Sequence, residues 1–143
     1  MWRETYLDTR VLSADPLELV HILYEHTLAM VANARRHLAA GNIAARGQSI
    51  SRAIAAIDEL DRSLDLEAGG AIARNLAALY HYMQSRLLAA NMRREDQPLA
   101  EVESLLGTLD EAWRTIRPAR NAGGFGAFAA EPQVEYAGQG WSA

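Results

Sequence analysis

The chain of 143 residues contains no cysteine and no lysine. Without cysteine it forms no disulfide and no thiolate metal site, which fits the reducing cytoplasm. All of its permanently charged basic side chains are arginines, and the formal net charge is −4 at pH 7. Because nucleic-acid binding depends on a surplus of positive charge, this balance disfavours a nucleic-acid partner.

Aromatic residues are also scarce, at 7% of the chain, and no apolar run reaches the length of about 18 residues that spans a membrane. We therefore expect an aliphatic core and no membrane insertion. Residues 1–5 lack the apolar centre of a secretory signal, which favours a cytoplasmic location. Half of the residues are hydrophobic, and the length predicts one domain.

Apolar residues recur in four segments at the spacing of three and four that is typical of an amphipathic helix. The predicted helices cover residues 16–39, 43–64, 71–92 and 98–117. Asp15 is a candidate N-cap of the first helix, Pro16 suits the first helical position, and Glu18 completes a capping box. Gly41 is expected to end that helix in the left-handed conformation.

The predicted joints are short, at residues 40–42, 65–70 and 93–97. Short joints make consecutive helices antiparallel, so the sequence predicts an all-α, up-down four-helix bundle. Pro118 is expected to stop the last helix because proline lacks the backbone N–H.

The two ends of the chain differ from the middle. We predict an N-terminal arm at residues 1–15, the bundle domain at residues 16–117 and a flexible tail at residues 118–143, because the Gly/Ala-rich tail lacks the apolar side chains for a core. The tail is either a plain extension or a short recognition motif. Its aromatic residues are Phe125, Phe128, Tyr136 and Trp141.

Candidate catalytic and metal-binding patterns are incomplete. Glu18 and His21 form the Glu-x-x-His unit of di-iron bundles, but such a site needs a second copy on another helix. His81 has Ala78 three residues before it, so the second copy is missing. We find neither a Ser/His/Asp arrangement nor a phosphate-binding glycine loop. The sequence therefore predicts no enzyme, no catalytic residue, no metal site and no cofactor.

His37 opens the sequence His-Leu-Ala-Ala-Gly, which is similar to the core of histidine phosphotransfer domains. Ala40 stands where those domains have a lysine. A histidine in the last turn of a helix also complements the helix dipole, without any transfer of phosphate. A histidine phosphotransfer or generic adaptor module remains the alternative function.

Two tyrosines flank the apolar stripe of the third helix. At about 100° per residue, Tyr80 falls about 60° from the centre of the stripe and Tyr82 about 100° away on the other flank. We expect both rings at the edge of the buried face, with their hydroxyls in water. They either rim the core or line a groove for a partner helix, and the pattern alone leaves both interpretations open.

From about Tyr6 to Arg117 the chain resembles the FliS family of flagellar export chaperones. The most specific match is the block GGAIARNLAALYHYM at residues 69–83, which continues into residues 86–91. The other matching positions are Tyr6, Val11, residues 13–16, residues 23–26, residues 102–106 and residues 111–113. The chain departs from the family pattern at Glu25 and His26, at Ala71 and at His81, where acidic residues or glycine are usual.

The resemblance implies a cytoplasmic chaperone without a cofactor. It would bind the C-terminal segment of flagellin, prevent premature polymerisation and deliver flagellin to the export gate of the flagellar type III secretion apparatus. The expected flagellin-binding residues are Ile72, Asn75, Leu76, Tyr80, Tyr82 and Met83. The resemblance also implies that the arm, through Tyr6, Leu7 and Val11, caps the binding surface while flagellin is absent; the alternative is that the arm is ordinary core packing.

Overall fold

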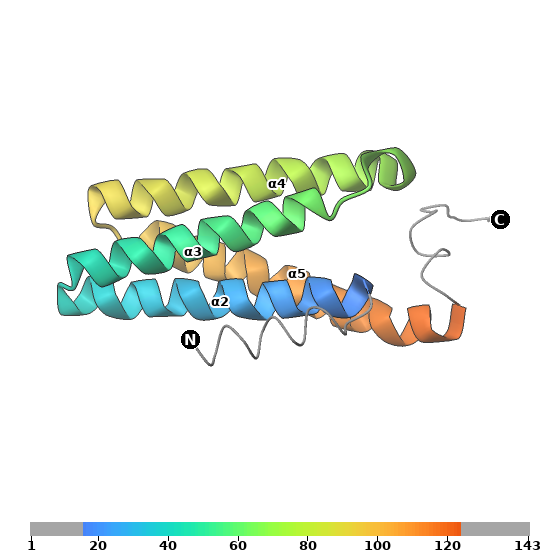
Figure 1. Ribbon diagram of the computed structural model, residues 1–143, viewed down its shortest axis with the longest axis horizontal. Coiled ribbons are helices and arrows are strands. Elements are labelled where there is room, and N and C mark those ends of the chain that lie inside the picture. The colour runs from blue at the N-terminus through green and yellow to red at the C-terminus, as the bar shows by residue number, and fades with distance from the viewer. Residues whose placement is uncertain (1–15, 124–143) are drawn as a thin grey trace.

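The computed structural model describes the backbone of residues 16–123 and the side chains of residues 17–116. This part of the chain consists of four helices without a strand (Figure 1). They are α2 (Pro16–Ala40), α3 (Ile43–Arg62), α4 (Leu66–Arg93) and α5 (Gln97–Gly123). The predicted arm, with its cap residues Tyr6, Leu7 and Val11, and most of the predicted tail lie outside the described residues.

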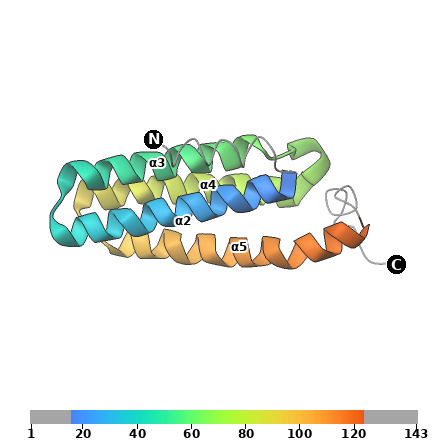
Figure 2. The same ribbon diagram turned by 60° about the horizontal axis from the view of Figure 1, so that its bottom comes forward.

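The helices alternate in direction, so that both the α2–α3 and the α4–α5 turns lie at one end of the bundle (Figures 1 and 2). α2 packs against α3 and α5, and α4 packs against the same two helices. α2 and α4 are therefore diagonal to one another. The predicted up-down four-helix bundle is confirmed. No helix in the described part of the chain is long and apolar enough to cross a membrane.

Aliphatic side chains from all four helices fill the core, together with two tyrosines. Fully buried members include Val31, Ile57, Leu60, Leu87, Leu99, Val102 and Leu106. Most of these positions follow the predicted apolar stripes. Ile72, an apolar residue of the predicted third helix, is not part of the core, because 48% of its surface is exposed. Its position is on the flank of α4, one residue away from buried Ala73.

Two turns depend on glycine conformations. Gly41 ends α2 with φ +77°, as predicted. In α4 the predicted start after Gly70 is only partly right: the backbone breaks at Gly70, but a further helical turn that begins at Leu66 precedes it. Asp65 caps this start by accepting hydrogen bonds from the backbone N–H groups of Glu67 and Ala68 at 3.1 and 3.0 Å. Gly70, at φ 54° and ψ −131°, then turns the chain within α4.

The end of α5 also differs from the prediction. The helix passes Pro118 and ends at Gly123. A proline inside a helix removes one hydrogen bond and crowds the carbonyl four residues before it, but a helix can continue past it with a kink. The last helix therefore extends beyond the predicted boundary at residue 117.

Candidate functional site

Tyr80 lies in the core of the bundle and not at its edge. Its side chain is buried, and its hydroxyl oxygen lies 2.7 Å from that of Tyr24. The prediction of a water-exposed Tyr80 hydroxyl is therefore wrong. The reason is that Tyr24, on the diagonal helix α2, supplies inside the core the hydrogen-bond partner that water would otherwise provide.

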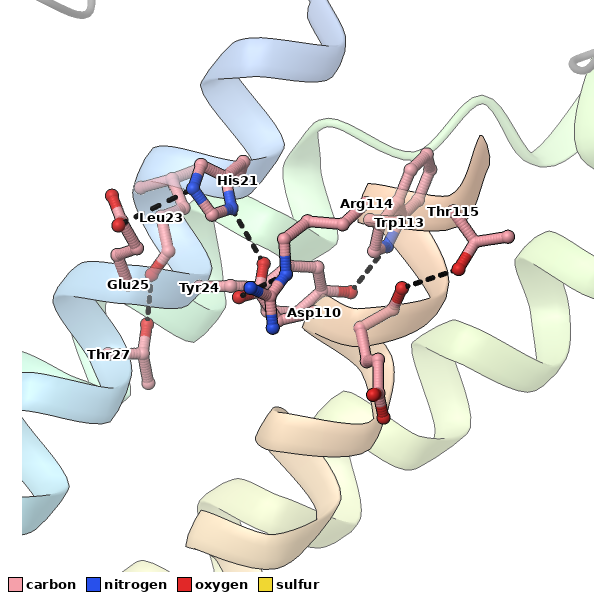
Figure 3. A network of polar contacts seen from close by, with 10 residues as sticks. His21, Leu23, Tyr24, Glu25, Thr27, Asp110, Trp113, Arg114 and Thr115 are labelled. Atoms are coloured by element: carbon pink, nitrogen blue, oxygen red, sulfur yellow. Dashed lines mark hydrogen bonds and ion pairs between the residues drawn. The ribbon is translucent and has the colours of Figure 1, made fainter. Parts of the chain in front are cut away.

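A third aromatic residue extends this contact to α5. The indole Nε1 of Trp113 donates a hydrogen bond of 2.9 Å to the hydroxyl of Tyr24 (Figure 3). Burial raises the pKa of both Tyr24 and Tyr80 above the ordinary value of a phenol. Both hydroxyls therefore stay protonated at neutral pH, and the three side chains connect α2, α4 and α5 as neutral hydrogen-bonding groups.

A contact between a histidine and a buried carboxylate lies beside the aromatic one. His21 Nδ1 is 2.8 Å from Oδ1 of the buried Asp110, and His21 Nε2 is 3.4 Å from Glu25 (Figure 3). Arg114 approaches the other Asp110 oxygen at 3.8 Å. His21 is half-buried and joins α2 to α5. In the described residues, no three His, Asp or Glu side chains form a group that could hold a metal ion.

The exposed part of the predicted site lies on the flank of α4. Ile72 and Tyr82 are 48% and 43% exposed, Asn75 is exposed and Leu76 is half-buried. Met83 is fully buried, as is Tyr80, so neither contacts a partner directly while the bundle stays closed. All six predicted residues thus lie on α4, but some are at its exposed surface and the others face the core of the bundle.

Tyr82 is held toward α5 by polar contacts. Its hydroxyl donates to Glu101 Oε2 at 2.5 Å, and Arg86 Nε donates to Glu101 Oε1 at 2.7 Å. These hydrogen bonds, from Tyr82 first and Arg86 second, lower the pKa of Glu101, while the bond to Glu101 raises the pKa of Tyr82. The Glu101 carboxylate therefore stays charged and fixes the tyrosine ring over the α4–α5 boundary.

Residues on this flank follow one another by three and four, the spacing of neighbours on a helix surface. We call this set, Ile72, Asn75, Leu79, Tyr82 and Arg86, the α4 stripe. Leu79, Arg86 and the facing Glu101 were not among the predicted site residues. Leu79 is half-buried and packs against the core.

Comparison with known proteins identifies the family. A sequence model described as "Flagellar protein FliS" matches residues 2–120, which is most of the chain. The chain belongs to the FliS family. The flagellar secretion chaperone FliS of Salmonella typhimurium is 41% identical over 118 residues, which cover 82% of this chain and 87% of that protein.

More distant FliS proteins match over a similar span. The flagellar secretion chaperone FliSB of Pseudomonas aeruginosa is 34% identical over 115 residues, covering 80% of this chain and 91% of the relative. FliS of Bacillus subtilis is 28% identical over 113 residues, covering 76% and 80%. The resemblance inferred from the sequence motifs is thereby confirmed.

The positions at which this chain departs from the FliS pattern lie mostly on the surface. Glu25, Ala71 and His81 are exposed, and His26 is half-buried. His81 Nε2 lies 3.4 Å from Asp61 Oδ2 on α3. His81 therefore faces the α3 side of α4, whereas the α4 stripe faces α5. None of the four side chains belongs to the bundle core, so the departures leave the fold of the family intact.

Proposed function

We propose that this protein is a flagellar secretion chaperone that binds the C-terminal segment of flagellin before export. The observation that carries the proposal is the match to the FliS family over residues 2–120, combined with a closed helical bundle that leaves apolar side chains of α4 exposed. Because the client is bound before it is exported, the protein acts in the cytoplasm. It delivers flagellin to the export gate of the flagellar type III secretion apparatus.

A segment that assembles through apolar helix faces would associate prematurely if those faces stayed exposed. Covering them on the surface of a bundle prevents this, and the segment folds as it binds. Coupled folding and binding of this kind usually buries about 1,000–3,000 Å². Neither a nucleotide nor a metal is required.

Within the predicted site we assign two roles. Ile72, Asn75, Leu76 and Tyr82 are accessible and make direct contact with flagellin. Tyr80 and Met83 lie directly beneath them on the core side of α4 and support the helix that presents them. The ring of Tyr82, already held by Glu101, needs little further ordering on binding, which favours affinity.

The N-terminal arm completes the proposal. Tyr6, Leu7 and Val11 cover the binding surface while flagellin is absent, and flagellin displaces them. Deleting residues 1–12 tests this role: flagellin then binds as tightly or more tightly, while the free chaperone aggregates more readily. Loss of flagellin binding in a deletion variant of full helicity would make the arm part of the binding surface instead.

The alternative, a histidine phosphotransfer or generic adaptor module, has no comparable support. Ala40 replaces the lysine of phosphotransfer domains, and His37 lies in the last turn of α2. Incubation of the pure protein with a phosphodonor, followed by mass spectrometry, tests it directly.

The decisive experiment is gel filtration of the protein mixed with flagellin from the same organism. We expect a 1:1 complex with full-length flagellin and no complex with flagellin that lacks its C-terminal segment. An unchanged elution profile with the full-length client would overturn the chaperone proposal. A complex that survives removal of the segment would place the contact elsewhere on flagellin.

A further inference from the structure

Three large apolar side chains are exposed at the end of the bundle that carries the α2–α3 and α4–α5 turns. Ile43 is 61% exposed, Leu88 52% and Met92 82%. Leu88 and Met92 are four residues apart and therefore neighbours on the surface of α4. Single exposed apolar residues are common on proteins, but a group at one place marks an interaction site.

A polar contact shows that the first turn of α3 and the last turns of α4 lie side by side. Arg46 Nε donates a hydrogen bond of 2.8 Å to Asn91 Oδ1. A Cβ atom on Gly47 would lie 3.8 Å from the Asn91 amide nitrogen, so the two helices approach closely here. Ile43 is one turn before Arg46, and Met92 follows Asn91. The exposed apolar side chains of both helices therefore belong to one end of the α3–α4 boundary.

Positive charge accompanies these apolar side chains. Arg93 and Arg94 are exposed, and within the described part of the chain neither forms an ion pair or a side-chain hydrogen bond. Glu95 adds one carboxylate next to them, while Asp96 is already bound by Arg35 at 2.8 Å. Two guanidinium groups thus remain available beside the apolar group.

Arg94 also adopts an unfavourable backbone conformation. It follows the last residue of α4 at φ 57° and ψ 48°, in the left-handed region, and it is the one described non-glycine residue with positive φ. Glycine is the usual residue at such a helix end because other side chains raise the conformational energy there. An arginine here therefore carries a conformational cost that a glycine would not have.

At the opposite end of the bundle, around the α3–α4 turn, carboxylates outnumber arginines, and Arg62 is paired with Glu59. Carboxylates gather where α3 ends and α4 begins: Asp58, Glu59, Asp61, Asp65 and Glu67. The two ends of the α3–α4 pair therefore differ in charge, although the net charge of the chain is negative. An acidic partner is repelled by one end and attracted to the other, which gives the positive end electrostatic selectivity.

We propose that Ile43, Leu88, Met92, Arg93 and Arg94 form a docking surface, the α3–α4 end surface, for an acidic segment of another protein that also carries apolar side chains. The guanidinium groups bind its carboxylates, and the three apolar side chains contact its apolar residues. The apolar component and the negative net charge of the chain favour a protein over a nucleic acid. The surface is separate from the α4 stripe, which faces α5, so both are available at once.

The test uses the full chain, labelled with ¹⁵N, and a synthetic helical peptide of about 16 residues with leucines one turn apart between glutamates. A second peptide has lysines in place of the glutamates. We expect the acidic peptide to shift the amide signals around Ile43, Leu88 and Arg94, and the lysine peptide to shift none. We expect the affinity for the acidic peptide to fall several-fold as salt is raised from low to high concentration.

Three variants separate binding from folding. The double charge reversal R93E/R94E should weaken binding of the acidic peptide at least about tenfold, since each like-charge contact opposes binding. Arg94→Gly removes the side chain but suits the left-handed conformation. It should therefore weaken binding of the peptide, while the melting temperature of the protein stays the same or rises. Arg74→Glu, at another exposed arginine of α4, is the matched control and should leave peptide binding unchanged.

The proposal is overturned if the acidic peptide shifts no signals, or shifts signals at the α4 stripe only. It is also overturned if Arg74→Glu weakens binding of the acidic peptide as much as R93E/R94E does. Salt-dependent self-association abolished by R93E/R94E would assign the surface to a second copy of the chain. Equally tight binding of a DNA duplex would assign it to nucleic acid.

Discussion

At the scale of single residues, the hydroxyl of Tyr24 is the centre of the hydrogen bonds in the core. It contacts the hydroxyl of Tyr80 and accepts from Trp113, and these residues come from three helices. Removal of a buried polar group is most costly when it leaves other polar groups without partners. The two tyrosines should therefore differ in their contribution to stability, although both are fully buried.

Tyr24→Phe should lower the free energy of unfolding by about 1–3 kcal/mol, because it removes the hydroxyl that bonds to both Tyr80 and Trp113. Tyr80→Phe should cost less, about 0.5–1.5 kcal/mol, because Tyr24 keeps the bond from Trp113. Urea unfolding followed by circular dichroism measures both values. A larger loss for Tyr80→Phe than for Tyr24→Phe would contradict the arrangement of the three side chains.

Tyr82→Ala should weaken flagellin binding by about 1–3 kcal/mol if the ring is an anchor of the interface. The side chain is exposed, so the helical circular dichroism signal should not change. His81→Ala is the control, because His81 is also exposed but faces α3. Isothermal titration with flagellin distinguishes them, and equal affinities for the two variants would remove Tyr82 from the site.

Residue positions were predicted from angles around an ideal helix, and this explains both the success and the failure. The angle correctly placed Tyr82 on an exposed flank. The angle did not predict the position of Tyr80. A ring about 60° from the centre of the stripe can turn inward when the core contains a hydroxyl that bonds to it. That partner, Tyr24, is 56 residues away in the sequence. No local pattern shows a pairing between diagonal helices.

At the scale of the helix, glycine determines the shape of α4. The sequence predicted that Gly70 lies in a joint, and the backbone does turn there, but a capped helical turn precedes it at Leu66. The Asp65 cap could have been recognised, since aspartate is a preferred N-cap residue. Three other helix boundaries agree with their predictions within about two residues, which is the usual uncertainty of a helix boundary. They are the start of α2, the end of α3 near residue 62 and the end of α4 near residue 93.

Two glycines in helices should respond oppositely to alanine. Gly70→Ala places a Cβ on a residue with φ 54° and ψ −131° and should cost about 1–3 kcal/mol. Gly107→Ala lies within α5, where a Cβ meets nothing within 4 Å, and should stabilise by about 0.5–1 kcal/mol. Thermal unfolding of both variants gives the comparison. Destabilisation by Gly107→Ala would mean that α5 is packed more tightly at this point than the structure shows.

At the scale of the whole molecule, the topology was predictable because it depends on short joints and apolar periodicity, both of which are local. The boundary of the bundle was not, because Pro118 does not end α5. A truncation that tests the role of the tail must therefore remove only residues after Gly123.

A chain that ends at Gly123 should melt within about 4 °C of the full-length protein, if residues 124–143 make no packed contact. It should also retain flagellin binding. Differential scanning calorimetry and gel filtration measure the two properties. A larger fall in melting temperature, or a lost complex, would give the tail a structural or a binding role.

The contact between Trp113 and Tyr24 has a further consequence for observing this protein in solution. The chain holds three tryptophans, and Trp113 is the one within the described helices. With Trp2 and Trp141 replaced by phenylalanine, the fluorescence of Trp113 alone reports on the meeting point of α2, α4 and α5. Indole emission moves to longer wavelength when its N–H exchanges a protein partner for water. The bundle thus contains its own optical reporter. The fluorescence of Trp113, recorded during stopped-flow mixing with flagellin, would show whether the core opens as flagellin binds.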